Sequence, residues 1–399
     1  MTEAERTGAL EQAGLNVLNL DPNEIALDLL TDVPARICVA EVAAATARAA
    51  RGGAPSPDLQ ALAERLYGPA RYVFSAKGRS AELALVAAAV EPGSTVLTHG
   101  LFRTTARALT ERKATLEMIP RRASDHGRAD VDLEWLSARL AQGRVDAVYL
   151  EPSNNALGGW PLSLENAEAV AAACRTASCR LLLDATRLLS NVCALGLPIG
   201  ETTKRFIALA DGFTVSCAKE LLVPLGSLVG VRDLPTQRKV WSHCFEEGTL
   251  LDPLEAKVAL ASGIEATLDF RHLKSRARQL KMLADELRAR EIPFLEPIGA
   301  HAVYVVVGPQ LGEGPLRSHA LQGLLYRAGG VRALIHGNPI LKTRLMRLTL
   351  TLGRFSDQDI TSIAQAVKAL FERAFEAPEL EARPGDSVHE AYFSRYARA

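Results

Sequence analysis

The stretch Leu181-Leu182-Leu183-Asp184-Ala185-Thr186-Arg187 gives the first indication of the fold. Three consecutive leucines predict a short strand that is buried on both faces, as in a parallel sheet covered by helices. The strand ends at Asp184, whose carboxylate must then find a partner or lose its charge. This residue is either part of a site at the edge of the sheet or the N-cap of the next helix.

Similar strands and intervening helices surround this stretch between about residues 70 and 230. The other predicted strands lie at 72–74, 95–97, 147–150, 212–215 and 226–231, and Ala- and Leu-rich helical patterns such as 80–90 and 164–177 lie between them. This alternation predicts an α/β fold with a mainly parallel sheet that is covered on both faces. Ligands of such sheets bind beyond the carboxyl ends of the strands, so the site is expected there.

After residue 253 the pattern changes to a separate α+β unit. We predict a long helix at 255–287 with a bend near Phe270, strands at 302–307 and 345–349, and helices at 318–327 and 357–373. The polar C-terminal residues with scattered aromatic side chains are expected to dock on the protein as a tail.

Composition and charge exclude several functions. The 399 residues include 46 basic and 46 acidic side chains, so there is no charge excess for nucleic acid or an anionic membrane. No segment approaches the roughly 20 apolar residues of a membrane span, and the acidic N-terminus does not resemble a signal peptide. The six cysteines form no C-x-x-C pair and are spaced irregularly for zinc. We therefore expect a cytoplasmic protein with free thiols and no metal site.

The ends of four predicted strands carry groups that suit one cofactor. Lys77-Gly78-Arg79 begins a helix and is either a phosphate cradle or an ordinary solvated turn. Asn154-Asn155 suits a small ligand or an Asx turn. Lys219 follows a buried strand among small residues, where desolvation favours an amine nucleophile, although most lysines are simply solvated. Together with Asp184, these groups match the phosphate, ring oxygen, aldehyde and ring nitrogen of pyridoxal 5'-phosphate (PLP).

These segments resemble the tryptophanase and tyrosine phenol-lyase family. The shared motifs are S-x-K-G-R-x-A-E at 75–82, N-x-x-G-G-x-P at 155–161, L-L-D-A-T-R at 182–187 and A-D-G-x-T-x-S-x-x-K at 210–219. The resemblance implies a PLP-dependent β-eliminating lyase with the fold type I, aspartate aminotransferase-like architecture. It also implies a large PLP-binding domain at 45–268, a small domain from 1–44 and 269–399, and a homodimer or homotetramer.

The resemblance also implies roles for individual residues. Lys219 would carry PLP as an internal aldimine and move the α-proton of an amino-acid substrate, by way of external aldimine and quinonoid intermediates. Asp184 would pair with the pyridinium nitrogen, and Arg347 would bind the substrate carboxylate as a bidentate fork. The residues implied around the cofactor are Lys77, Gly78, Arg79, Phe102, Asn155, Asp184, Arg187, Ser216 and Lys219. The straightforward alignment places Arg103 at the ring-stacking position and Phe102 one place earlier, so both stay candidates.

Other positions depart from the family pattern. Pro57 stands where the family has the tyrosine that protonates the leaving aromatic ring, and Pro224 stands at its monovalent-cation site. His336 takes the substrate-selecting position and is our candidate catalytic and substrate-binding residue. Tyr392 resembles one of the aromatic residues that close over the substrate.

We therefore predict a lyase that cleaves or replaces a β- or γ-substituent of a non-aromatic or unusual amino acid. The alternative is an aldolase or transferase that acts on the Cα–Cβ bond, with His336 or His99 as a base. Cleavage of tryptophan or tyrosine and a catalytically silent PLP-binding protein are the least favoured interpretations.

Overall fold

The computed structural model describes residues 1–33, 40–52, 56–121, 127–308, 311–314, 316–338, 340–382 and 394–398. The chain divides into two compact units, which are described separately below. Unit 1 comprises Met1–Asp32, Arg278–Ile298 and Ala302–Ala399, and unit 2 comprises Val33–Ala277 and Gly299–His301. The long helix α13 (Arg271–Ala289) begins in unit 2 and ends in unit 1.

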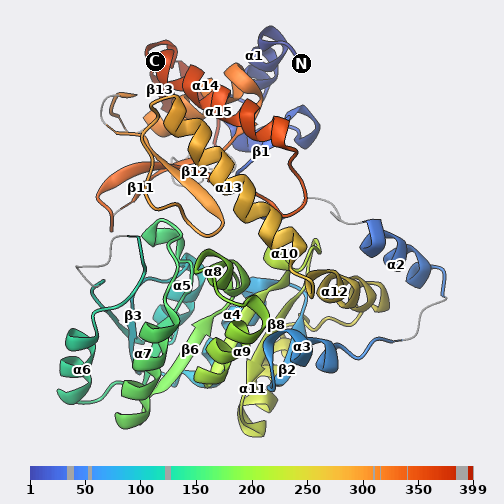
Figure 1. Ribbon diagram of the computed structural model, residues 1–399, viewed down its shortest axis with the longest axis vertical. Helices are drawn as coiled ribbons and strands as arrows, with labels where there is room; N and C mark the ends of the chain where they lie inside the picture. The colour runs from blue at the N-terminus through green and yellow to red at the C-terminus, as the bar shows by residue number, and fades with distance from the viewer. Residues whose placement is uncertain are drawn as a thin grey trace. The chain divides into compact units, whose positions relative to one another are not determined.

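Unit 2 is built on a seven-stranded sheet with the order β2-β8-β7-β6-β5-β3-β4 (Figure 1). The strands are β2 (Arg71–Ser75), β3 (Thr95–Thr98), β4 (Thr115–Met118), β5 (Ala147–Leu150), β6 (Arg180–Asp184), β7 (Gly212–Ser216) and β8 (Ser227–Val231). The pairs from β7 through β6, β5 and β3 to β4 are parallel, which confirms the expected α/β fold. Only β8 runs antiparallel to both of its neighbours. The short connection from β7 to β8 explains this direction, since a parallel return needs a crossover of about a dozen residues or more.

Helices cover both faces of this sheet. One apolar cluster joins α4 (Gly78–Ala89), α5 (Arg103–Glu111) and α11 (Leu234–Glu246) to the strands through residues such as Leu85, Leu109 and Val240. On the opposite side, α7 (Leu164–Thr176) packs on β6 and on α9 (Ile199–Leu209), which in turn contacts α3 (Leu59–Tyr67). The other helices of unit 2 are α2 (Ala40–Ala50), α6 (Leu133–Ala141), α8 (Leu188–Ala194), α10 (Cys217–Glu220) and α12 (Leu254–Thr267).

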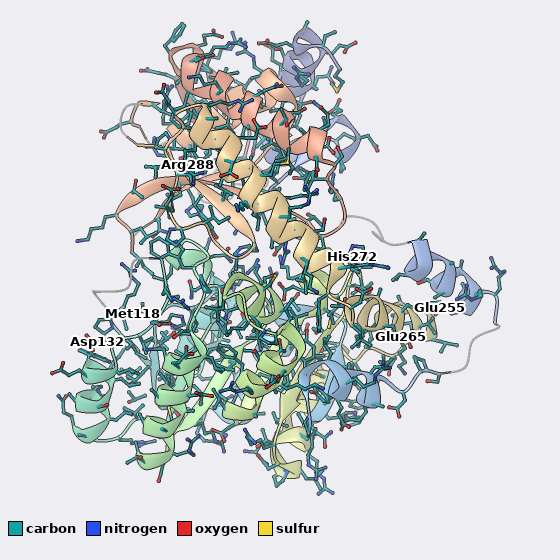
Figure 2. All side chains as sticks on the ribbon, in the orientation of Figure 1. Met118, Asp132, Glu255, Glu265, His272 and Arg288 are labelled. Carbon is teal, nitrogen blue, oxygen red and sulfur yellow. The ribbon has the colours of Figure 1, made fainter. Side chains whose placement is uncertain are left out.

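The edge strand β4 was not predicted from the sequence. Its side chains are largely exposed, so it lacks the apolar alternation that marks a strand. Met118 is 52% exposed and is labelled at this edge in Figure 2. The helix predicted at 255–287, with a bend near Phe270, consists of two helices that are separated at this residue, α12 and α13. Phe270, between them, has a φ of +58°, which a continuing α-helix cannot adopt.

Unit 1 is the smaller α+β unit. Its antiparallel sheet has the order β11-β12-β9, with β9 (Ala302–Val306), β11 (Leu334–Asn338) and β12 (Thr343–Thr349). Two helices, α14 (Arg317–Gly329) and α15 (Asp357–Glu372), bury aliphatic side chains such as Leu324 and Ile363 in the core with the sheet. A short parallel pair, β1 (Leu27–Asp28) and β10 (Val331–Arg332), joins the N-terminal segment to this core.

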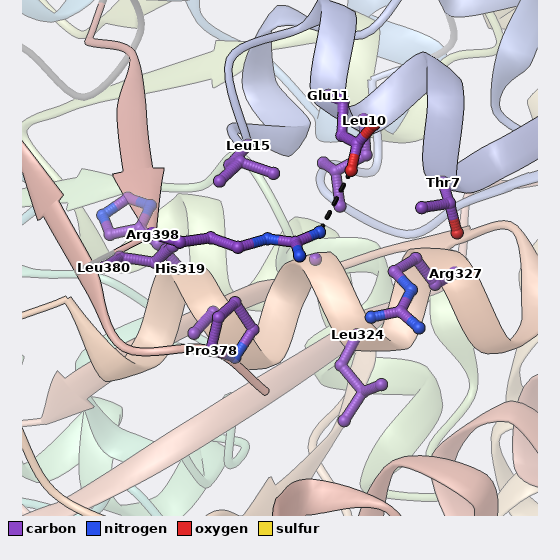
Figure 3. A pocket seen from close by; sticks show the side chains of 12 residues that line it. Thr7, Leu10, Glu11, Leu15, His319, Leu324, Arg327, Pro378, Leu380 and Arg398 are labelled. Carbon is purple, nitrogen blue, oxygen red and sulfur yellow. Dashed lines mark hydrogen bonds and ion pairs between the residues drawn. The ribbon is translucent and has the colours of Figure 1, made fainter. Parts of the chain in front are cut away.

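Residues near the two termini contact each other within unit 1. The strands β13 (Leu380–Ala382) and β14 (Tyr396–Arg398) pair antiparallel, and the backbone N–H of Tyr396 donates to the carbonyl of Gly14 at 2.8 Å. Arg398 Nη2 lies 3.0 Å from Glu11 Oε1 of α1 (Glu3–Gln12), across a crevice of about 20 Å³ that α14 also lines (Figure 3). The described end of the chain therefore docks on the N-terminal helix. Tyr392 lies outside the described residues.

No described helix combines the length and the apolar character that crossing a membrane requires.

Candidate active site

A cavity of about 190 Å³ lies where several strands of unit 2 end. The strands β2, β5, β6 and β7 point the same way, so the residues that follow them meet at one edge of the sheet. The cavity is lined by Gly78, Arg79, Glu82, Phe102, Thr104, Glu151, Asp184, Thr186, Arg187, Ser216 and Lys219. Seven of the nine residues expected around the cofactor are among them, and Lys77 and Asn155 are not.

The start of α4 forms one wall of the cavity. Lys77 is the N-cap residue and makes no side-chain capping hydrogen bond, and the first two residues of the helix, Gly78 and Arg79, line the cavity. A Cβ atom at Gly78 would lie only 2.6 Å from the side chain of Ser216, so glycine is needed for this close approach. Ser227 Oγ donates to the carbonyl of Lys77 at 2.9 Å and fixes the turn. The arrangement suits a phosphate group.

Asp184 forms the floor of the cavity at the end of β6. Its side chain is only 6% exposed, and Oδ1 accepts a hydrogen bond from the backbone N–H of Thr186 at 3.0 Å. Burial raises the pKa of Asp184, while Thr186 and the charges of Arg187 and Lys219 act in the opposite direction. A cationic ring nitrogen beside this carboxylate would favour its ionised form.

Lys219 approaches the same cavity from α10, immediately after β7. Its side chain is half-buried, and its positive charge acts on Asp184. The strand before it is held in place because the backbone N–H of Ser216 donates to Thr186 Oγ1 at 3.0 Å. The structure thus brings together the lysine and the carboxylate that the sequence predicts.

Two further carboxyl groups line the cavity and were not assigned a role from the sequence. Glu82 lies one turn after Gly78 on α4, and its carboxylate accepts hydrogen bonds from the hydroxyls of Thr104 and Thr105. Burial and the nearby charge of Asp184 raise the pKa of Glu82 to about 7. Burial also raises the pKa of Glu151. The sequence contains a signal that Glu82 lines the cavity, because residues spaced i, i+4, as Gly78 and Glu82 are, share one helix face.

The aromatic and amide candidates differ in their placement. Phe102 lines the cavity directly before α5, whereas Arg103, the first residue of that helix, is not among the lining residues. Asn155 Oδ1 lies 2.9 Å from His301 Nε2.

His99, a candidate base, is buried beyond β3. Burial lowers the pKa of His99 to about 4, although a hydrogen bond with the Glu151 backbone acts to raise it. His99 is therefore neutral near pH 7.

The candidate substrate residues with a described position belong to unit 1. Arg347 lies on β12, and its Nη2 donates to the carbonyl of Leu30 at 2.9 Å. His336 lies on β11, where burial lowers its pKa. Their assignment to the substrate remains a proposal.

Solved structures of several enzymes, one of them with PLP as an internal aldimine, share this fold. Threonine aldolase from Leishmania major has a TM-score of 0.68 at 14% identity, covering 86% of this chain and 99% of that one. Aspartate aminotransferase from Thermotoga maritima also has a TM-score of 0.68 at 14% identity, covering 93% and 97% of the two chains. These likenesses define the fold type I, aspartate aminotransferase-like fold, and the cavity of this chain joins a lysine and a buried carboxylate at one edge of its sheet.

Sequence comparisons identify the family within this class. The chain belongs to the beta-eliminating lyase family, whose model matches residues 28–366. A probable tryptophanase from Halobacterium salinarum is 28% identical, with 95% of this chain and 92% of the relative covered. A tyrosine phenol-lyase from Pasteurella multocida is 26% identical, with 100% and 94% covered.

The lining residues fit the cofactor of this family. The uncapped start of α4 suits the phosphate, the buried Asp184 suits the protonated ring nitrogen, and Lys219 can reach the same cavity. PLP, when bound, supplies an electron sink for charge that develops at the substrate α-carbon.

Proposed function

We propose that unit 2 is the PLP-binding domain and unit 1 the small domain of a lyase that cleaves or replaces a β- or γ-substituent of a non-aromatic amino acid. The observation that carries the proposal is the single cavity that Lys219, Asp184 and the start of α4 share. We assign the phosphate to Lys77, Gly78, Arg79 and Ser216, the ring face to Phe102, and the ring oxygen to Asn155 and Arg187.

The residues divide the chemical work between them. The Lys219 amine would hold the cofactor through its aldehyde and would move the proton at the substrate α-carbon. Asp184 would hold the ring nitrogen in its protonated form, because a negative charge beside it favours the cationic ring. We assign the substrate carboxylate to Arg347, and contacts to the side chain to His336 and Tyr392.

The proposed substrate class rests on Pro57. An aromatic carbon leaving group must be protonated before it departs, and proline has no proton to give. A sulfur, oxygen or nitrogen leaving group needs less assistance. The proposal therefore favours substrates with a heteroatom on the β- or γ-carbon.

Trapping the bound cofactor tests the first part of the proposal. Borohydride reduction of the protein with PLP should add the cofactor to the peptide that contains Lys219, as measured by mass spectrometry. Lys219→Ala should abolish this modification, while Lys204→Ala, which removes an exposed lysine on α9, should not. Modification of another lysine would overturn the assignment.

A substrate panel tests the second part. We expect S-methyl-L-cysteine and water to give pyruvate, ammonia and methanethiol faster than L-tryptophan or L-tyrosine gives any 2-oxo acid. Faster cleavage of the aromatic amino acids would overturn the proposed specificity. Release of acetaldehyde and glycine from L-threonine, with no 2-oxo acid from any heteroatom substrate, would indicate an aldolase instead.

A further inference from the structure

A buried ionic network lies directly behind Lys219, outside the cavity. Glu220 follows Lys219 on α10 and is 1% exposed as a side chain, and Arg276 of α13 is 2% exposed. Arg276 Nη2 lies 2.9 Å from Glu220 Oε1, and the Ser190 hydroxyl donates to the same carboxylate oxygen. Arg276 also donates to Ser190 Oγ, so the three side chains contact one another. All three belong to unit 2.

This network joins the two chain segments that carry the main cofactor residues. Glu220 accepts hydrogen bonds from the backbone N–H groups of Leu189 at 3.1 Å and Ser190 at 3.2 Å, in the first turn of α8. That helix begins directly after Arg187, three residues beyond Asp184. The Glu220 carboxylate therefore fixes the segment of Lys219 against the segment that follows Asp184.

The segment that carries Lys219 needs such an anchor. Helix α10 has only four residues, and the backbone N–H of Leu221 donates to the Cys217 carbonyl at 2.9 Å to close its single turn. A single helical turn is marginal by itself, because its few hydrogen bonds do not offset the cost of ordering the chain.

Stability alone does not account for a buried ion pair at this place. Taking both charges out of water offsets most of their attraction, and an apolar replacement is often as stable. In this pair the two side chains are 2% and 1% exposed, whereas in the pair Arg332–Asp28 each side chain is 13% exposed. Glu220 of this pair directly follows Lys219 in the sequence, and neither Glu220 nor Arg276 lines the cavity.

We propose that Arg276, Glu220 and Ser190 form a positioning network that holds the Lys219 amine in place relative to Asp184. This inference rests on the proposed role of Lys219 as the residue that links PLP. Glu220, Ser190 and Arg276 are positioning residues, because none of them lines the cavity.

The test compares two serine variants of the full chain. Ser190→Ala removes a hydroxyl that contacts the Glu220 carboxylate, and Ser163→Ala removes one that donates to the buried Asp130 at 2.7 Å, away from Lys219. Both variants are expected to melt at a lower temperature than the wild type. Only Ser190→Ala should slow the linkage of PLP to Lys219, by about ten- to a hundredfold, since small displacements of a reacting group are costly. Growth of the visible band of the lysine-linked cofactor, after mixing PLP with apoprotein, measures this rate.

A second variant keeps the test decisive if Ser190→Ala does not fold. Glu220→Gln retains the size of the side chain and removes the charge that holds Arg276, so it should slow linkage in the same way. If the wild type links PLP to Lys219 and the folded variants do so at its rate, the positioning role is overturned while the proposed function stands. If the wild type links no PLP at Lys219, the proposed function fails, and the positioning role fails with it.

Discussion

The two compact units differ in where they keep their charged side chains. In unit 1, the pairs Arg278–Asp357 and Arg398–Glu11 leave more than half of each side chain exposed, and the core is aliphatic. The pair Arg332–Asp28 of that unit leaves 13% of each side chain exposed. Unit 2 instead buries the pair Arg276–Glu220 almost completely.

Unit 2 also buries carboxyl groups around its cavity. Glu82, Glu151 and Asp184 are each less than a tenth exposed, and burial raises the pKa of all three. Buried charge is costly unless it is paired or bound to a partner. Both units have apolar cores, but unit 2 also buries carboxyl groups and an ion pair around and behind the cavity that we propose binds PLP.

Breaking the buried pair should have the largest effect on stability. Arg276→Met leaves Glu220 buried without its guanidinium, and we expect a loss of about 3–5 kcal/mol, determined from urea unfolding. The double variant Arg276→Met/Glu220→Leu removes both charges and should recover most of this loss. A single variant as stable as the wild type would show that Glu220 finds another partner or becomes neutral, and the contrast between the units would fail.

Asp184→Asn should have the next largest effect, this time on catalysis. Asparagine keeps the shape but loses the charge that we propose retains a proton on the cofactor ring, so turnover of S-methyl-L-cysteine should fall about 10²–10³-fold. Asp130→Asn is the matched control, because Asp130 is also a buried carboxyl and lies outside the cavity. It should lower stability without this loss of turnover. An active Asp184→Asn variant would contradict the proposed role.

Glu82 should make the stability of the apoprotein depend on pH. Its folded-state pKa of about 7 exceeds the ordinary value of 4.5, so between these values the unfolded chain releases a proton that the folded chain retains. The contribution of Glu82 to stability is thus present below about pH 4.5 and is lost as the pH rises toward 7. The Glu82→Gln side chain cannot ionise. As the pH rises over this interval, the free energy of unfolding of this variant should therefore increase by about 1–3 kcal/mol relative to that of the wild type.

Thermal melts of both proteins between about pH 5 and pH 8 measure this difference. Glu165→Gln, which removes an exposed carboxyl on α7, controls for the loss of one charge. A difference between Glu82→Gln and the wild type that does not change with pH would mean that Glu82 titrates normally.

Much of the site follows from strand ends that the sequence marks clearly. Three leucines identify β6, and Asp184 must then emerge where Gly78 and Lys219 also lie, because parallel strands share one carboxyl edge. The family resemblance supplied Phe102 and Arg187, which local pattern alone does not indicate. The cavity in the structure contains all five of these residues.

The buried charges could not be read from the sequence in the same way. Glu82 and Glu151 look like ordinary solvated carboxylates, because most glutamates are exposed. Glu220 and Arg276 are 56 residues apart, and no local periodicity shows that they pair. The direction of β8 depends on a short connection, which hydrophobic patterns do not report. The bend predicted near Phe270 is a complete break between two helices, because this one residue has a positive φ.

The smallest expected effect comes from the exposed pair in unit 1 that corresponds chemically to Arg276–Glu220. Arg398 and Glu11 leave 61% and 54% of their side chains in solvent, where water and salt screen the attraction (Figure 3). A double-mutant cycle of Arg398→Ala and Glu11→Ala should give a coupling free energy below about 1 kcal/mol, which falls further in high salt. The backbone hydrogen bond from Tyr396 to Gly14 is retained in these variants and should keep the C-terminal strand docked. A coupling free energy as large as the loss expected for Arg276→Met would show that solvent exposure does not explain how strongly the ion pairs of the two units stabilise the protein.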